Sequence, residues 1–354
     1  MKPRHVLRLL TAALTAWAGN AMAQELSDVS FQSIAVQPPQ ISGKAPADAA
    51  PTFLTGLNYP WLNYGWDFGD TAWGHRGVSD PGSRAIIAAD FADMHRKGVK
   101  VVRWFLFGDG RAAPEFDGRG LATGFDKYFY DDLDAALEIA QANDIRLILV
   151  LFDFHFFDPA RTVNGVQMGG HANLVHDPEA ASSLIDNALT PLFKRYSRHP
   201  AIFAWDIINE PEWSMKQTWV EATRTVNPEA MHDFVKRIVE SIHSQTGQLA
   251  TLGSAKLKQL AQWQGLGLDF YQYHDYEYRF GNLEQPPASF LKLDKPCILG
   301  EFPTKNTVRI AELYMYTAQQ NGFAGALAWS YRAQDGYSDF QSVAGRFAAW
   351  TRSH

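Results

Sequence analysis

Residues 203–213 read Phe-Ala-Trp-Asp-Ile-Ile-Asn-Glu-Pro-Glu-Trp. The short, mostly apolar start of this stretch predicts a buried β-strand. The strand ends in the polar pair Asn209 and Glu210, and Pro211 stops it because proline has no N–H to donate to a sheet. A strand that delivers an amide and a carboxylate at its C-terminal end is typical of a reactive site at the mouth of a barrel.

The sequence on both sides of this strand repeats one pattern of elements: a short apolar run is followed by a loop and then by a helical pattern. We expect strands at 53–58, 101–105, 146–152, 201–208, 249–252, 268–273, 297–300 and 324–329. Helical patterns follow them at 84–97, 130–142, 180–196, 229–244, 257–263, 289–293, 308–320 and 341–351. This α/β alternation predicts a parallel sheet with crossover helices, closed into a single (β/α)8 TIM barrel. The alternative is an open, doubly wound sheet, but no glycine-rich phosphate loop follows the first strand.

In a (β/α)8 barrel the reacting groups come from the C-terminal ends of the strands. Polar or aromatic residues stand at nearly all of these predicted ends: Asn58, Arg103, Asp153 with His155, Asn209 with Glu210, His274 with Tyr276, Glu301 and Trp329. Residues scattered over a surface would not fall at one rim so regularly. Asp206 lies inside its strand and is expected to be a buried, hydrogen-bonded structural residue. His171 and His176, in the long loop after the third strand, are expected to be solvated.

Two of these residues, Glu210 and Glu301, follow the fourth and seventh predicted strands and can face each other across the barrel mouth. Paired carboxylates are the requirement for glycoside hydrolysis, in which one group donates a proton and the other attacks the anomeric carbon. Arg103 would keep a nearby carboxylate ionised, and a tyrosine hydroxyl can donate to it. The alternative for either glutamate alone is a structural ion pair.

The ordered set of motifs resembles glycoside hydrolase family 5, a cellulase- and mannanase-like family of clan A, whose members are retaining (β/α)8 glycosidases. The motifs are Val102-Arg103, Asp153-Phe154-His155, Asn209-Glu210-Pro211, His274-Asp275-Tyr276, Gly300-Glu301-Phe302 and Trp329. The resemblance implies double displacement through a glycosyl-enzyme intermediate, with the two carboxyl groups about 5–5.5 Å apart. It also implies that the reaction needs no metal and no organic cofactor.

The same resemblance implies a role for each matched residue. Glu210 would be the acid/base and Glu301 the nucleophile. Asn209 would bind the 2-hydroxyl of the sugar in the −1 subsite, on the non-reducing side of the cleaved bond. The other expected substrate contacts are Arg103 and Tyr276, which would orient and ionise Glu301, His155 and His274, which would line the −1 subsite, and Trp329, which would form its floor.

Aromatic residues crowd the loops after the predicted strands and suggest stacking platforms for successive sugars. They include Trp61, Trp66, Trp73, Phe156, Phe157, Trp213, Trp219, Tyr276, Tyr278 and Phe280. Simple packing of the long loops explains half of them equally well. The expected substrate is an oligosaccharide or polysaccharide with β-linkages, of the β-mannan or β-glucan type. The loops do not decide between these glycans, nor between endo and exo action.

Other functions fit the same residues. A transglycosylase would use both carboxylates with an acceptor sugar in place of water. A non-catalytic carbohydrate-binding barrel would keep the aromatic platforms without turnover. A metal-dependent barrel hydrolase would want a His-x-His pair at the first strand, which the sequence lacks.

The chain begins with a signal-peptide pattern, in which basic residues precede a short apolar stretch and Ala-Met-Ala at 21–23 forms a cleavage signal. We expect a signal peptide over 1–23 that is cut after Ala23, a flexible leader over 24–51, and a catalytic domain over 52–354. The expected location is therefore secreted or periplasmic.

Charge and cysteine content limit the partners. The formal net charge is −6, and removal of the signal peptide, which carries three basic residues and no acidic one, brings it to −9. This argues against nucleic acid or an anionic membrane as the main partner, and a monomer is expected. The single cysteine, Cys297, excludes a disulfide within the chain and lies in an apolar run typical of a core.

Overall fold

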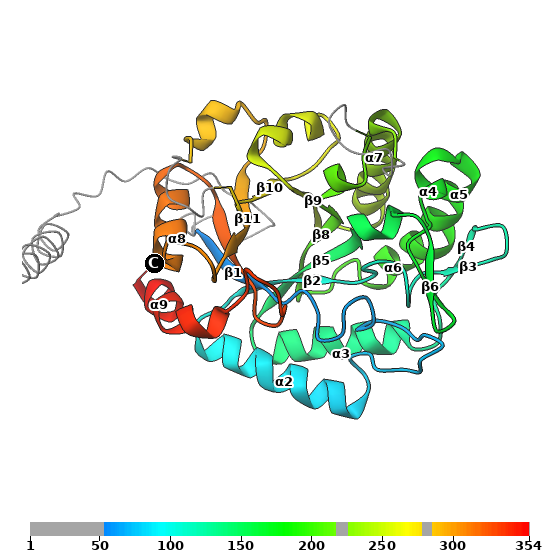
Figure 1. The fold of residues 1–354 in the computed structure, drawn as a ribbon, viewed down its shortest axis with the longest axis horizontal. Coiled ribbons are helices and arrows are strands. Elements are labelled where there is room, and N and C mark those ends of the chain that lie inside the picture. The colour runs from blue at the N-terminus through cyan, green and yellow to red at the C-terminus, as the bar shows by residue number, and fades with distance from the viewer. Residues whose placement is uncertain (1–52, 217–225, 278–284, 354) are drawn as a thin grey trace, which may run out of the picture. The chain divides into compact units, whose positions relative to one another are not determined.

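The computed structural model describes residues 53–216, 226–277 and 285–353. Within these ranges, eight parallel strands form a closed barrel (Figure 1). In chain order they are β1 (Leu54–Asn58), β2 (Val101–Phe105), β5 (Arg146–Asp153), β8 (Ile202–Asn209), β9 (Leu249–Ser254), β10 (Tyr271–His274), β11 (Cys297–Pro303) and β12 (Gly325–Trp329). Each strand pairs with the next, and β12 pairs with β1. Closure confirms the predicted (β/α)8 barrel and excludes the open sheet.

Helices surround the barrel and form the crossovers between successive strands (Figure 1). The helices that follow single strands are α2 (Pro81–Arg96), α3 (Phe129–Ala142), α7 (Pro228–Gln245), α8 (Ala311–Gln320) and α9 (Phe340–Ser353). After β5 the crossover is divided into α4 (Asn173–His176), α5 (Pro178–Leu184), a π-helical turn (Ile185–Leu189) and α6 (Thr190–Arg195). After β9 and β10 the described residues hold only 3₁₀ helices, at Leu257–Trp263 and Ala288–Leu291. All eight predicted units are present, two of them with short crossovers.

Helix α7 shows how local sequence sets these boundaries. Asn227 caps the helix by accepting from two backbone N–H groups, and Pro228 occupies the first turn, where its missing N–H costs nothing. The apolar residues then recur at helical spacing and are buried against the barrel: Met231, Phe234, Val235, Ile238 and Ile242.

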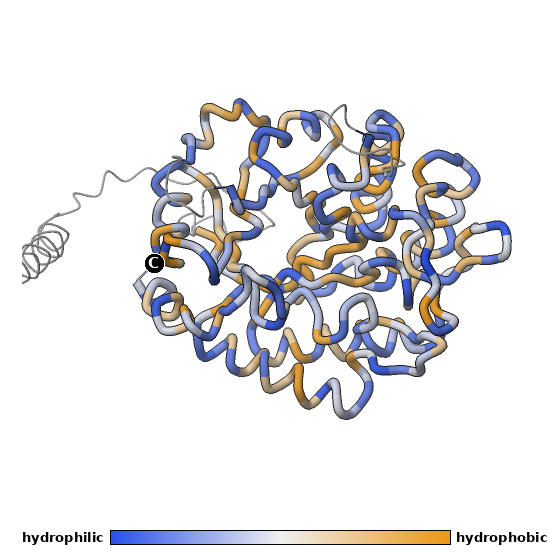
Figure 2. Tube along the Cα trace, viewed as in Figure 1, coloured by the Kyte–Doolittle hydropathy of each residue, from blue (hydrophilic) through white to orange (hydrophobic). Residues whose placement is uncertain are grey.

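The core has two parts, because alternate side chains of each strand point to opposite sides of the barrel wall. On β8, Ala204 packs inside the barrel with apolar residues of other strands. Its neighbour Trp205 packs outside, edge-on to Phe193 of α6 at 5.0 Å between ring centroids. Figure 2 shows the barrel strands as mostly hydrophobic, with polar stretches in the surrounding loops. The barrel therefore places an apolar core beneath its carboxyl rim.

Two short hairpins lie in the long loops after β2 and β5, where the sequence predicted only loops. They are β3 (Glu115–Phe116) with β4 (Ala122–Gly124), and β6 (Arg161–Val163) with β7 (Val166–Met168). The predicted signal peptide over 1–23 and leader over 24–51 lie outside the described residues, so the domain boundaries stay a prediction. Among the described helices, none has the length and apolar character that crossing a membrane requires.

Candidate active site

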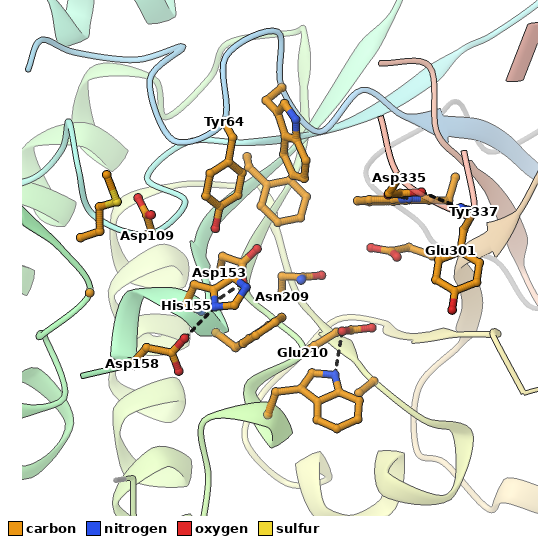
Figure 3. A pocket seen from close by; sticks show the side chains of 18 of the residues that line it. Tyr64, Asp109, Asp153, His155, Asp158, Asn209, Glu210, Glu301, Asp335 and Tyr337 are labelled. Atoms are coloured by element: carbon orange, nitrogen blue, oxygen red, sulfur yellow. Dashed lines mark hydrogen bonds and ion pairs between the residues drawn. The ribbon is translucent and has the colours of Figure 1, made fainter. Parts of the chain in front are cut away.

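A pocket of about 1330 Å³ opens at the carboxyl ends of the barrel strands (Figure 3). Six of the eight predicted site residues line it, and five of these are Asn209, Glu210, Tyr276, Glu301 and Trp329. His155 also lines the pocket, whereas Arg103 and His274 are buried behind the two glutamates. The structure therefore brings the predicted residues together at one rim, although their positions in the chain span more than 200 residues.

Glu210 occupies the first position after β8 and has a left-handed backbone, with φ 48° and ψ 51°. This conformation is uncommon for a residue with a side chain, and such strain is concentrated at functional sites. One carboxylate oxygen, Oε2, accepts from the indole N–H of Trp213 at 2.8 Å. The other, Oε1, lies 2.7 Å from Nδ1 of His274. The turn and both partners fix the direction of the carboxyl group.

Glu301 lies on β11 and is only 3% exposed. Its Oε1 accepts from Nη1 of Arg103 at 2.7 Å, and its Oε2 accepts from the hydroxyl of Tyr276 at 2.7 Å. These are the two contacts that the sequence analysis expected to orient and ionise Glu301. A guanidinium and a phenol hydroxyl both favour the charged carboxylate, so each oxygen of Glu301 has a partner that stabilises the anion.

Arg103 is fully buried and connects three strands of the barrel. Besides Glu301, it donates to Oδ1 of Asn58 at 3.1 Å on β1. On β8 it donates to Oδ2 of Asp206 at 2.8 Å and to Oδ1 of Asn209 at 2.9 Å. Asp206 is fully buried and hydrogen-bonded, as expected from its place inside the strand. The fork geometry of one guanidinium thus sets the positions of four side chains.

Burial raises the pKa of both glutamates at the site and lowers that of the histidine between them. Burial raises the pKa of Glu210 to about 7, against the effect of the Trp213 hydrogen bond and the Arg103 charge. Burial also raises the pKa of Glu301, and the charge of Glu210 adds to this rise, whereas His274, Arg103 and the hydroxyl of Tyr276 oppose it. Burial lowers the pKa of His274 to about 4, so its ring is neutral near pH 7. The guanidinium bonded to Glu301 favours the charged form of that carboxyl, whereas the direct partners of Glu210 are a neutral indole and a neutral imidazole.

The spacing of the two glutamates decides which chemistry they can perform. Glu210, Glu301 and His274 each present one N or O atom, and these three atoms lie within 4.8 Å of one another. An approach of 4.8 Å or less between the nearest oxygens agrees with the short carboxyl separation of retaining glycosidases. The same three residues are the one candidate cation-binding group among the described residues. Both oxygens of Glu301 already accept from Arg103 and Tyr276, and an adjacent guanidinium opposes a cation.

The remaining predicted residues form the pocket wall. Trp329 donates its indole N–H to Asp335 at 2.8 Å and packs edge-on to Trp61. His155 belongs to a short 3₁₀ helix (Phe154–Phe157), and its Nδ1 lies 2.6 Å from Asp158 rather than beside either glutamate. Its assignment to the −1 subsite stays a prediction.

The predicted aromatic platforms divide into two groups. Trp61, Trp213 and Tyr276 line the pocket, whereas Phe156 and Phe157 are buried in the core. Trp66 and Trp73 pack against each other and do not line it. Trp219, Tyr278 and Phe280 lie outside the described residues. Packing thus explains part of the aromatic content, as the sequence analysis allowed.

One histidine expectation was wrong. His176 is exposed, as expected, but His171 is only 6% exposed. Its ring stacks on Phe116 with centroids 4.3 Å apart, and burial lowers its pKa to about 4. The long loop folds back on the β3 hairpin and covers the ring, which a reading of loops as solvated could not anticipate.

Sequence reasoning missed two residues that shape the site. Trp213 was expected only as a sugar platform, yet it also donates to Glu210. Glu212 is 2% exposed and accepts from Ser254, the backbone of Ala255 and the indole of Trp263. These bonds anchor the turn that carries Glu210. The one feature of the sequence that could have indicated these two residues is the clustering of Glu and Trp in residues 210–213.

The closed barrel and its paired carboxylates define a retaining glycoside hydrolase that cleaves β-linked glycans. More narrowly, the chain belongs to glycosyl hydrolase family 5, because the family model described as Cellulase (glycosyl hydrolase family 5) matches residues 66–335. This confirms the family resemblance carried by the motifs.

Individual relatives point in the same direction. The chain is 27% identical over 324 residues to a protein named mannan endo-1,4-beta-mannosidase from Mytilus edulis, covering 78% of this chain and 83% of the relative. It is 28% identical over 336 residues to a protein of the same name from Cryptopygus antarcticus, covering 82% and 83%. Its fold is similar to the crystal structure of endo-1,4-beta-mannanase from Eisenia fetida, with a TM-score of 0.72 and 23% identity over 86% of this chain and 91% of that one.

Proposed function

We propose that this chain is an endo-acting β-1,4-mannanase in which Glu210 is the acid/base and Glu301 the nucleophile. The observation that carries the two roles is the difference in partners: Glu301 accepts from a guanidinium, whereas Glu210 contacts a neutral indole and a neutral imidazole. The choice of mannan and of endo action is supported by the names of the relatives from Mytilus edulis and Cryptopygus antarcticus.

In the first step, the Glu301 carboxylate attacks the anomeric carbon while Glu210 protonates the leaving glycosidic oxygen. The bond from carbon to that oxygen breaks, and a covalent glycosyl-enzyme forms. In the second step, Glu210 removes a proton from water, and the water oxygen attacks the same carbon and releases Glu301. A raised pKa suits Glu210 to both directions of proton transfer near neutral pH.

The neighbours of the glutamates assist these steps. Because Oδ1 of Asn209 accepts from Arg103, the Asn209 amide group is turned so that its N–H₂ can donate to a sugar hydroxyl in the pocket. Tyr276 donates to the oxygen of Glu301 that is not paired with Arg103. This hydrogen bond can be kept while the negative charge on Glu301 decreases and returns during the two steps.

The proton on Glu210 makes the reaction sensitive to pH. We expect kcat/KM to fall about tenfold per pH unit above pH about 7, because Glu210 must be protonated to act as the acid and burial raises its pKa to about 7. At low pH the rate should fall as Glu301 takes up a proton. The measurement is a pH series on mannohexaose at temperatures where the fold persists.

Glu210→Gln with an aryl glycoside is the control for this pH series. An aryl leaving group needs no proton, so the alkaline fall of the first step should disappear in this variant. An alkaline limb that persists there would assign the pKa to another group.

Substrate choice is tested by mass spectrometry of products from β-mannans, β-glucans and xylan. We expect short oligosaccharides of mixed length from mannan at early times, and release at least about tenfold slower from the other glycans. Release of only monosaccharide or disaccharide would contradict endo action. Products longer than the starting oligosaccharide would show transglycosylation.

A further inference from the structure

Another carboxyl group lies in the pocket and takes no part in the steps above. Asp153 ends β5, is 5% exposed and lines the pocket. In the barrel register it is paired with Asn209 of β8, the residue before Glu210. Figure 3 shows Asp153 on the same side of the pocket as Asn209, between Tyr64 and His155. It therefore lies within reach of a sugar bound beside Glu210.

Asp153 differs from the neighbouring carboxylates because, within the described part of the chain, its oxygens form no ion pair, although the nearby charges of His155 and Arg103 lower its pKa. Asp109 forms an ion pair with Arg111 at 2.7 Å, and Asp158 lies 2.6 Å from His155. Among the residues that the structure describes, the only donor to Asp153 is the backbone N–H of His155, which reaches Oδ1 at 3.1 Å. Oδ2 is therefore available to a ligand: it can accept a hydrogen bond when the carboxyl is ionised and donate one when it is protonated. Burial raises the pKa of Asp153 to about 7, so both uses are open near neutral pH.

The hydroxyl of Tyr64 is a second polar group on the same side of the pocket as Asp153. It lies on the loop after β1, and Figure 3 shows it directed towards Asp153. The oxygen is buried and has no hydrogen-bond partner among the described residues. The ring is held edge-on against Trp61 at 4.7 Å, with the guanidinium of Arg111 5.0 Å from its centroid. Buried polar atoms are normally satisfied, so an orphaned hydroxyl beside a pocket indicates a partner supplied by the ligand.

On the basis of the proposed function, we propose that Asp153 and Tyr64 form a hydroxyl-binding pair that holds one sugar unit of the β-linked substrate chain beside Glu210. Adjacent hydroxyls of a pyranose can each donate and accept. One can donate to the carboxyl of Asp153 while the next accepts from the Tyr64 O–H. The pair binds substrate and does not move the reacting atoms, so it should act on KM more than on kcat.

The test uses Asp153→Asn and Tyr64→Phe in the complete enzyme with mannohexaose. Asparagine keeps an oxygen for the His155 N–H but replaces the free carboxyl oxygen by an N–H₂ group. We expect Asp153→Asn to raise KM about tenfold and Tyr64→Phe about fivefold, with kcat within about twofold of wild type. The double variant should raise KM by less than the product of the two single increases, because both groups contact the same sugar. Calorimetry in a Glu301→Gln background measures the same losses as affinity, without turnover.

Asp177→Asn is the matched control. Asp177 caps α5 by accepting from the backbone N–H of Glu179 at 2.9 Å, the same local role that Asp153 has towards His155, and it does not line the pocket. Its replacement should leave KM and affinity unchanged. If Asp153 only caps its helix, Asp153→Asn will behave like Asp177→Asn.

Unchanged affinity in Asp153→Asn would overturn the proposal, and so would a lower melting temperature with wild-type KM. Failure of the wild type to cleave mannan would instead contradict the proposed function. The variants are then compared on the β-glycan that the wild type does cleave. If it cleaves none, they are compared by calorimetric binding of mannohexaose and cellohexaose. Unchanged affinity would still overturn the proposal there, and weakened affinity would support it.

Discussion

Glu301→Gln is expected to lower kcat on mannohexaose by at least about 10⁴-fold while the barrel stays folded. Glutamine can still accept from Arg103, but its neutral amide is too weak a nucleophile to form the glycosyl-enzyme. Initial rates together with a thermal melt measure both parts of the expectation. Glu138→Gln is the control and should keep wild-type turnover, because Glu138 is an exposed glutamate that pairs with Arg84 and does not line the pocket. Wild-type-like turnover in Glu301→Gln would remove Glu301 from the mechanism.

Added azide separates the roles of the two glutamates in alanine variants. In Glu301→Ala, azide can enter the space left by the carboxylate and displace an aryl leaving group once, which inverts the anomeric configuration. In Glu210→Ala, azide replaces water in the second step, and the product keeps the starting configuration. We expect an α-glycosyl azide from the first variant and a β-glycosyl azide from the second. The reverse pattern would exchange the two assignments.

Arg103→Met is the second change with a large expected effect, and it acts on stability as well as activity. Removing the guanidinium leaves Asp206 and Glu301 as buried carboxylates without their cation, which costs about 3–5 kcal/mol of unfolding free energy. Turnover should also be lost, because Glu301 is neither oriented nor held ionised. Denaturant unfolding and initial rates measure the two effects.

A double variant separates these effects of Arg103. Arg103→Met with Asp206→Asn removes one of the stranded charges, so part of the unfolding free energy should return while activity stays lost. Equal stability of the single and double variants would mean that Asp206 is not the group stabilised by Arg103. Recovery of turnover in the double variant would mean that Arg103 is not needed to orient Glu301.

The sequence predicted the barrel well because its strands carry strong local signals. The run that becomes β8 is apolar and is closed by Pro211, and the observed strand ends at Asn209, one residue beyond the predicted boundary. The two shortest predicted helices, at 257–263 and 289–293, are the two that form only 3₁₀ turns. Local periodicity is reliable where an element is long and amphipathic, and it weakens as the element shortens.

The site was predictable as a set of residues but not as a set of contacts. Rim positions follow from strand ends, so Glu210 and Glu301 could be named from the sequence. The hydrogen bond from Trp213 to Glu210 depends on the left-handed turn at Glu210, which no local pattern indicates. Burial of His171 and isolation of Asp153 depend on how distant loops fold together. These features are tertiary, and a single sequence carries no period or spacing that reports them.

Because Arg103 bonds to residues on three strands, the chain cannot be cut into two fragments that each keep a complete site. Its partners come from β1, β8 and β11, near the beginning, middle and end of the barrel. A fragment ending after β8 contains Glu210 without Glu301, and one starting there contains Glu301 without Arg103. Neither half can hold an aligned carboxylate pair alone. Co-expressed halves would therefore become active only on reassembly, which makes hydrolysis a readout of barrel closure and a basis for a split-protein reporter.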